Sequence, residues 1–179
     1  EDSLTGLPNR RSIDEHLGQT LNDSRRSEAP FAVLLIDVNA FKQVNDRFGH
    51  SAGDQLLTGI ARRLERAIRG TDFAGRLGGD EFVVIARGLN SDGYETTTED
   101  PDVRFGEFVQ RIRHVLNGPM RVRGSEVDVV VSVGVAVWPN DGDSTDQLLG
   151  CADALMYRDK VRTSVSPRGA VYEDAQVAI

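Results

Sequence analysis

Disulfide chemistry and membrane spans are both missing from this sequence. Cys151 is the single cysteine in 179 residues, so no disulfide can form within the chain, which is compatible with a reducing compartment. No apolar run approaches the roughly 18 residues of a spanning helix, and no signal peptide is visible. We therefore expect a cytoplasmic protein with no membrane segment in this chain, or the cytosolic part of a larger, membrane-bound protein.

An excess of positive charge is missing as well. The formal net charge is -7, which weighs against a nucleic-acid-binding surface. The hydrophobic content of 39% is enough for an ordinary core, and the length predicts one domain. The chain starts at Glu1, without a methionine, and enters a motif directly, so we expect a domain taken from a longer protein whose sensory or regulatory domain is absent.

Apolar patterning predicts strands that alternate with helices. Runs of strand length indicate a buried strand at 31–38, a hairpin at 72–77 and 82–87, and a strand at 127–137. Helical spacing predicts helices at about 12–26, 51–69, 103–117 and 145–161, with an exposed polar loop at 88–102 and a loop-like tail after Thr163. This order predicts an α/β fold with a mixed, largely antiparallel central sheet flanked by helices.

Two acids occupy the turn of the predicted hairpin. Asp80 and Glu81 follow Gly78 and Gly79, whose freedom to adopt positive φ permits a tight turn beside a ligand. Asp37 ends the apolar run of the preceding strand, and a helical crossover places that strand in the same sheet. Three acids gathered at one sheet edge repel each other unless a cation holds them, so this pattern predicts a divalent-metal site.

The segment 39–54 is dense in polar groups between apolar anchors. Lys42 offers a point charge for a phosphate group, while Asn45 and Asp54 offer amide and carboxylate edges to a purine base. A guanine, with its N1 and N2 donors, suits Asp54. The segment therefore indicates a nucleotide-binding region.

Three motifs in order resemble the GGDEF diguanylate cyclase family. They are Asp2-Ser3-Leu4-Thr5-Gly6-Leu7-Pro8-Asn9-Arg10-Arg11, the block from Asp37 to Asp54, and Gly78-Gly79-Asp80-Glu81-Phe82. The resemblance covers about residues 2 to 162 and implies a fold similar to the palm of nucleotide cyclases and polymerases. It also implies condensation of two GTP into cyclic di-GMP with release of two pyrophosphates. We expect a cyclase domain at 1–165 and a C-terminal tail or linker at 166–179.

The resemblance further implies a site for two metal ions, Mg²⁺ or Mn²⁺. It assigns Asp37, the carbonyl of Val38, Asp80 and Glu81 to the metals, with Glu81 beside the reacting centre. Either Asp80 or Glu81 accepts the proton of the attacking hydroxyl, and the sequence leaves that choice open. Lys42 steadies the phosphate charge in the transition state.

The positions that the resemblance assigns to GTP are Phe41, Lys42, Asn45, His50, Asp54, Gly79 and Lys160. Beyond Lys160 the family has Gly-Arg-Asn, and here Thr163, Ser164 and Val165 stand in those places. A phosphate-binding arginine is therefore missing, and Arg162 or Arg168 are candidates to replace it. Upstream of the acidic turn, Arg69 and Asp72 match an inhibitory site for the product. Activity is expected from a homodimer, because each domain binds one GTP.

Other interpretations stay open at this stage. The domain could bind GTP or cyclic di-GMP and regulate an attached phosphodiesterase or other output domain without making product. A class III-like nucleotide cyclase or a palm polymerase is a further alternative, which Asn45 and Asp54 disfavour. The individual residues also have ordinary roles to set against these: solvated turn acids, a helix cap at Asp37, a packing histidine at His50, surface lysines, and a surface ion pair between Arg69 and Asp72.

Overall fold

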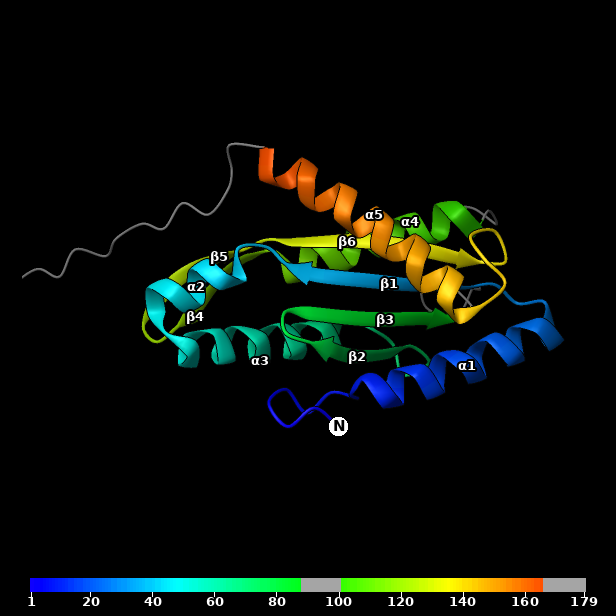
Figure 1. Ribbon diagram of the computed structural model, residues 1–179, viewed down its shortest axis with the longest axis horizontal. Coiled ribbons are helices and arrows are strands. Elements are labelled where there is room, and N and C mark those ends of the chain that lie inside the picture. The colour runs from blue at the N-terminus through cyan, green and yellow to red at the C-terminus, as the bar shows by residue number, and fades with distance from the viewer. Residues whose placement is uncertain (88–100, 166–179) are drawn as a thin grey trace, which may run out of the picture.

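The computed structural model describes residues 1–87 and 101–165. Its elements are α1 (Arg10–Ser27), β1 (Phe31–Val38), α2 (Phe41–Phe48), α3 (His50–Ala67), β2 (Phe73–Gly78), β3 (Glu81–Arg87), α4 (Pro101–Leu116), β4 (Gly118–Val122), β5 (Ser125–Val129), β6 (Val131–Trp138) and α5 (Thr145–Val165). Figure 1 shows them as a sheet with helices on both faces. The predicted α/β fold class is confirmed, whereas most of the expected loop at 88–102 and all of the tail at 166–179 lie outside the described residues.

The central sheet has the strand order β2-β3-β1-β6, and each of its three pairings is antiparallel. β1 is buried along its whole length, which explains why its sequence is an unbroken apolar run. Successive side chains of a strand point to opposite faces. Phe31, Val33 and Leu35 accordingly belong to one core cluster, while Leu34 and Ile36 belong to the other.

The helices form one layer on each face of this sheet (Figure 1). α1 and α5 pack on the face of Val33 and Leu35, while α3, α4 and the β4–β5 hairpin pack on the face of Leu34. The last carbonyl of each of α3 and α4 accepts a hydrogen bond from an arginine of the other helix. Arg63 of α3 donates to the carbonyl of Leu116 at 2.9 Å, and Arg111 of α4 donates to the carbonyl of Ala67 at 3.0 Å. These bonds satisfy carbonyls that a helix end otherwise leaves without a partner.

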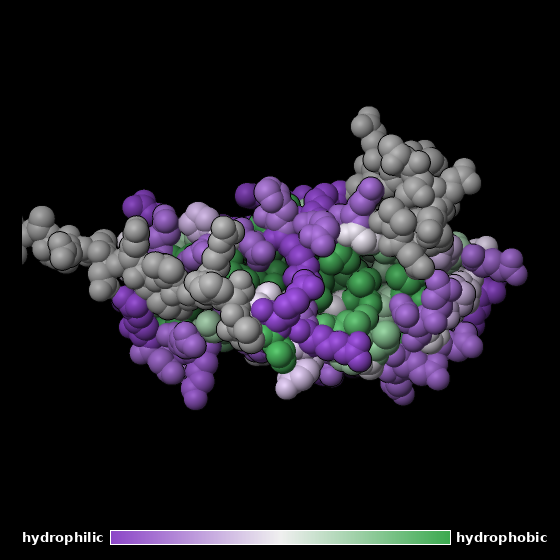
Figure 2. Space-filling view, turned by 90° about the horizontal axis from the view of Figure 1, so that it is seen from above, coloured by the Kyte–Doolittle hydropathy of each residue, from purple (hydrophilic) through white to green (hydrophobic). Residues whose placement is uncertain are grey.

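The surface seen from the side of α5 and β6 is mostly hydrophilic around an apolar area (Figure 2). Among the described residues, Tyr157 and Val161 of α5 are large apolar side chains with 67% and 49% of their surface exposed. No helix within residues 1–87 and 101–165 is long and apolar enough to pass through a bilayer.

One prediction about the second half of the chain was wrong, and one strand there was not predicted. The run 127–137 is not one strand: β5 ends at Val129, pairs with the unpredicted β4 in a separate two-stranded sheet, and β6 starts at Val131. No turn residue marks this break. The backbone groups there are satisfied instead by Asn39, whose N–H donates to the carbonyl of Val130 at 2.9 Å, and by Asn117, whose side chain accepts from Val131 at 2.9 Å.

One helix was not predicted, and another differs from its predicted bounds. A separate helix, α2, fills part of the polar block, and Gly49 with a φ of 83° divides it from α3. α5 continues to Val165 and does not end at 161, so Thr163 is helical. The absence of glycine after Lys160 explains the extension, because helices often end on a glycine in the left-handed conformation.

Candidate functional site

Two of the predicted acids face each other across neighbouring strands. Asp37 of β1 lies opposite Glu81 of β3 in the antiparallel register. Both continue the alternation of Leu35 and Val83, so their side chains lie on the face covered by α1 and α5. Directly opposed side chains have Cβ atoms about 5 Å apart, and like charges at that spacing are destabilising. The juxtaposition predicted from sequence is confirmed, and it calls for a cation.

The turn between β2 and β3 brings the third acid to the same edge. Gly78 and Gly79 have φ values of 138° and 54°, as predicted for a tight turn, with a register shift after Arg76. The N–H of Val38 donates to the carbonyl of Asp80 at 3.2 Å, so the turn is bonded to the end of β1. Asp80 thereby sits beside the strand end that carries Asp37.

Electrostatics at this edge disfavour the ionised acids. Burial, and then the charge of Asp37, raise the pKa of Asp80 above its ordinary value. Burial also raises the pKa of Glu81, with further contributions from Asp37 and Asp80. Both shifts reflect negative charge gathered in a partly desolvated place, which is a property of sites that take up cations.

A cation already lies against Asp37 in the form of Lys160. Its ammonium is 2.7 Å from one carboxylate oxygen of Asp37 and 2.9 Å from the other. The Asp37 side chain is 8% exposed and the Lys160 side chain 42%, so the carboxylate of this pair is desolvated while the lysine still reaches solvent. The sequence placed Lys160 on a phosphate of GTP, and the pairing with a predicted metal ligand was not foreseen. Asp37 does not cap the following helix, because the N-cap residue of α2 is Ala40.

The donors at this edge fit a hard divalent cation in their chemistry, because carboxylate and carbonyl oxygens are what Mg²⁺ prefers. Within the described ranges, however, no group of three or more His, Cys, Asp or Glu is arranged to hold a metal ion. Mg²⁺ commonly takes one or two carboxylates and completes its shell with substrate phosphates and water. The acids therefore fit a metal whose shell is completed by water or by the phosphates of a nucleotide.

The first motif of the chain braces the acidic turn, which sequence reasoning did not assign. Arg76 donates to both carboxylate oxygens of Asp2, at 2.9 and 3.1 Å, and to the carbonyl of Gly79, at 2.7 and 3.1 Å. Asp2 also accepts from the backbone and the hydroxyl of Thr5. Burial opposes its ionisation, but these hydrogen bonds and the charge of Arg76 lower the pKa of Asp2 overall. Asp2 of the first motif therefore holds Arg76, and Arg76 holds the carbonyl of Gly79, the residue before Asp80.

Asn45, one of the two predicted base-binding residues, lies where α2 packs on α3. Asn45 Oδ1 is buried there without a hydrogen-bond partner. A Cβ added at Gly53 would lie 2.0 Å from that oxygen and 3.1 Å from the Phe41 ring, so only glycine admits this packing. A buried unsatisfied carbonyl oxygen is costly unless a ligand donates to it. This supports Asn45 as a group that receives a nucleobase donor.

Replacement of Gly53 by alanine is expected to weaken GTP binding by about tenfold, the equivalent of one lost hydrogen bond, because the methyl group displaces the Asn45 amide. Calorimetric titration of GTP checks this. Gly150→Ala is the matched control, since a Cβ at that helical position meets nothing within 4 Å. Equal GTP affinity in the two variants would remove Asn45 from the site.

Three other predicted substrate residues are exposed near this point. Lys42 lies on α2, His50 opens α3, and Asp54 follows one turn later. Asp54 also lines a shallow pocket of about 390 Å³ with Arg62, Met120 and other residues of α3 and β4. Their exposure leaves them available to a ligand, and it removes a packing role for His50.

Arg69 and Asp72 form a turn between α3 and β2. The backbone N–H of Arg69 donates to a carboxylate oxygen of Asp72 at 3.1 Å, and the N–H of Asp72 donates to the carbonyl of Arg69 at 3.0 Å. Burial raises the pKa of Asp72. Arg111 of α4 lies close to both residues. Burial and the charge of Arg69 lower the pKa of Arg111, the charge of Asp72 raises it, and the net effect is a lower pKa. No sequence signal marked Arg111, because it comes from a distant helix.

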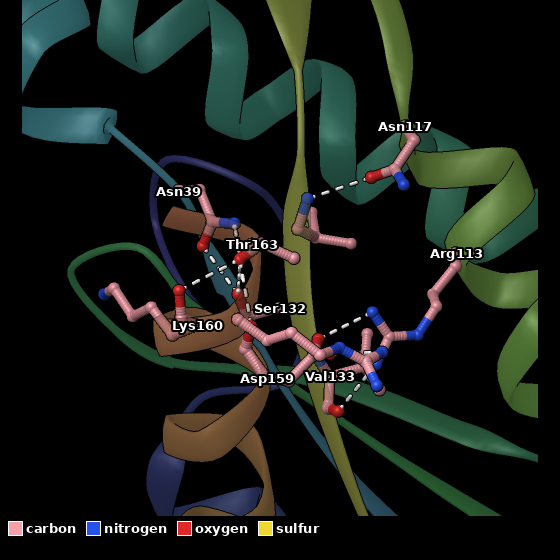
Figure 3. A network of polar contacts seen from close by, with 10 residues as sticks. Asn39, Arg113, Asn117, Ser132, Val133, Asp159, Lys160 and Thr163 are labelled. Carbon is pink, nitrogen blue, oxygen red and sulfur yellow. Dashed lines mark hydrogen bonds and ion pairs between the residues drawn. The ribbon is translucent and has the colours of Figure 1, made fainter. Parts of the chain in front are cut away.

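Thr163, the first of the residues that depart from the family pattern, lies near the end of α5 (Figure 3). Thr163 accepts a hydrogen bond from the Asn39 amide at 3.1 Å. Arg162, a candidate to replace the missing arginine, has one guanidinium nitrogen 3.4 Å from Asp159 and is otherwise 84% exposed. Arg168, the other candidate, lies outside the described residues. α5 is thus bonded to the chain segment directly after Asp37.

An antiparallel sheet that presents acids at a hairpin turn, beside a helical layer that can receive a base, defines an α/β domain of the nucleotide-cyclase and polymerase palm class. Residues 1–164 match the model of the family "Diguanylate cyclase, GGDEF domain". The chain belongs to the GGDEF family.

Relatives and solved structures agree with this assignment. The chain is 38% identical over 159 residues to the bifunctional diguanylate cyclase/cyclic di-GMP phosphodiesterase MucR of Pseudomonas aeruginosa, covering 89% of this chain and 22% of MucR. It is 36% identical over 177 residues to the diguanylate cyclase TpbB of the same species, covering 98% and 38%. A crystal structure of a sensory box/GGDEF family protein from Caulobacter crescentus superposes with a TM-score of 0.82 at 36% identity, covering 90% of this chain and 98% of that one. The chain therefore spans well under half the length of these two curated relatives.

Proposed function

We propose that this chain is a diguanylate cyclase domain that condenses two GTP into cyclic di-GMP and two pyrophosphates. The observation that carries the proposal is the cluster of Asp37, Asp80 and Glu81 at one sheet edge, where register and turn geometry gather carboxylates that repel one another. Membership in the GGDEF family, with relatives named as diguanylate cyclases, supports the same reaction.

The acids of the sheet edge are the residues that would hold divalent cations. Asp37, Asp80, Glu81 and the carbonyl of Val38 are the proposed ligands, and two Mg²⁺ or Mn²⁺ per site would supply charge neutralisation at the triphosphate. Asp80 and Glu81 are both candidates to accept the proton of the attacking 3′-hydroxyl.

The helices bind and orient the nucleotide in this proposal. Asn45 and Asp54 contact the guanine, the Phe41 ring packs beside Asn45, and Gly79 lets the backbone approach. Lys42 and Lys160 contact the phosphates, and His50 completes the substrate set. The exposed Lys42 side chain on α2 is free to reach an incoming triphosphate.

The reaction requires two copies of the domain. Each copy holds one GTP, and the hydroxyl of each nucleotide attacks the α-phosphate of the other, so the active site forms between two protomers. Holding two reactants in line is the main catalytic contribution expected of such an arrangement. A neighbouring sensory or regulatory domain would bring the copies together, and a cytoplasmic location remains a prediction.

A forced dimer tests this function. The domain fused to a parallel coiled coil at its N-terminus is incubated with Mg²⁺ and GTP, ATP, CTP or UTP, and products are identified by mass spectrometry. We expect cyclic di-GMP from GTP and no cyclic dinucleotide from the other nucleotides. Absence of product from GTP would contradict the proposal.

A second candidate function is a regulatory module that binds GTP or cyclic di-GMP without making product. Two observations favour it: α5 continues as helix through Thr163 where the family has a glycine and an arginine, and the relative MucR joins cyclase and phosphodiesterase in one protein. GTP binding without turnover in the forced dimer is its expected signature.

Product inhibition at Arg69 and Asp72 is a further part of the proposal. Arg111, adjacent to both, would add a second guanidinium to a bound dinucleotide. Replacement of Arg69 by alanine is expected to raise the inhibition constant of cyclic di-GMP at least about tenfold, because a charge-assisted hydrogen bond is lost. Inhibition is measured by product titration, with Arg66→Ala, an exposed arginine of the preceding helix α3, as control. Unchanged inhibition in Arg69→Ala would refute the site.

A further inference from the structure

The hydroxyl of Thr163 lies in a small polar cluster at the end of α5 (Figure 3). It accepts from the Asn39 amide at 3.1 Å and is 3.4 Å from the Ser132 hydroxyl, which itself donates to Asn39 Oδ1 at 2.7 Å. Thr163 also contacts the carbonyls of Asp159 and Lys160, at 3.0 and 3.1 Å. The cluster therefore joins α5 to β6 and to the segment that follows β1.

The preceding turn of the same helix face is held by Asp159, four residues before Thr163. Asp159 is only 8% exposed, and its carboxylate accepts from the backbone N–H of Val133 at 3.0 Å and pairs with Arg113 at 2.6 Å. Figure 3 shows these bonds on the β6 side of the helix. Lys160 is the next residue, so its backbone is bracketed by two anchored positions.

The anchored helix places Lys160 on Asp37, as described above. Asn39, the partner of Thr163, comes two residues after Asp37, so one hydrogen-bond cluster sets both ends of the Lys160–Asp37 pair. With both backbones held, the four-carbon stem of Lys160 is the part that can move. Its ammonium and a divalent cation cannot both take the two oxygens of Asp37.

We propose that Thr163, together with Asn39 and Ser132, is a positioning residue that holds Lys160 on Asp37, where the lysine competes with a divalent cation for that carboxylate. The exchange of Lys160 from Asp37 to a nucleotide phosphate rests on the proposed function, whereas the competition itself does not. The Thr163 hydroxyl stands at a place where the family pattern has glycine, which has no side chain to form these bonds.

Mn²⁺ binding without nucleotide, followed by electron paramagnetic resonance of the free ion, tests the proposal on the whole chain. Lys160→Met is expected to bind Mn²⁺ about tenfold more tightly than the parent, because the competing charge is gone. Thr163→Val keeps the shape of the side chain but loses the hydroxyl, so it should bind Mn²⁺ roughly threefold more tightly. Thr163→Ser keeps the hydroxyl and should restore the parent affinity.

Ser132→Ala provides a second way to break the cluster and is expected to match Thr163→Val. Circular dichroism of each variant verifies that it is folded. Mn²⁺ affinity that is unchanged in Lys160→Met would overturn the competition, and a Thr163→Ser variant that behaves like Thr163→Val would overturn the role of the hydroxyl. Since the readout needs neither GTP nor turnover, these results stand apart from the outcome of the cyclase assay.

Discussion

Replacement of Asp80 by asparagine is expected to lower cyclic di-GMP formation by the forced dimer at least about 100-fold, the usual cost of removing one electrostatic contributor from an active site. Asparagine has nearly the same shape, so the turn and its bond from Val38 to the backbone of residue 80 are retained. What is lost is the carboxylate charge that is proposed to bind the divalent metal. The rate is measured by chromatography of the product.

The unfolding temperature shows whether the Asp80→Asn variant loses activity without losing its fold. Burial and the charge of Asp37 raise the pKa of Asp80 in the folded protein, so its ionisation opposes folding above its ordinary pKa. Asparagine never ionises, and the variant should unfold at the same temperature as the parent or higher. Asp14→Asn, on the exposed side of α1, is the matched control and should retain full activity. An Asp80→Asn dimer with more than a tenth of the parental rate would contradict the assignment.

Replacement of Gly134 by alanine is expected to lower the free energy of unfolding by about 3 kcal/mol or more. Gly134 lies in β6 directly under α5, and a Cβ there would be 1.9 Å from the carbonyl oxygen of Ala152 and 2.3 Å from the backbone nitrogen of Met156. Because both contacts are backbone, no side-chain rotation relieves them. α5 would have to move off the sheet and take Lys160 with it.

Urea unfolding followed by circular dichroism measures this loss. Gly150→Ala makes the same chemical change inside α5, where the added Cβ meets nothing within 4 Å. Alanine is preferred over glycine in a helix by up to about 1 kcal/mol, so the control should be slightly more stable than the parent. A Gly134→Ala protein within 1 kcal/mol of the parent would show that α5 does not pack on β6 as described.

The sequence correctly predicted the parts of the fold that depend on residues adjacent in the chain, such as apolar runs and glycine turns. The strand at 31–38 was predicted with its observed bounds because it is buried on both faces and therefore reads as an unbroken apolar run. The turn at 78–81 was recognisable because its glycines adopt φ values that other residues avoid. Together they placed Asp37 near Asp80 and Glu81 correctly.

The parts that sequence did not predict depend on contacts between distant segments. The break after Val129 has no local marker, because the neighbouring valines suit either strand and distant Asn39 and Asn117 satisfy the backbone. The brace from Asp2 through Arg76 and the pairing of Lys160 with Asp37 likewise join residues far apart in the chain. Periodicity carries no information about such pairs.

The central claim is that two domains each activate one GTP, and a covalently linked dimer with one parental and one Asp80→Asn domain tests it most directly. Cyclic di-GMP needs two phosphodiester bonds, one for each activated GTP. In a single turnover with GTP and Mg²⁺, the parental dimer should form cyclic di-GMP. The mixed dimer should stop at the linear dinucleotide that still carries a triphosphate. Cyclic di-GMP from the mixed dimer at half the parental rate, or no product from the parental dimer, would contradict the account.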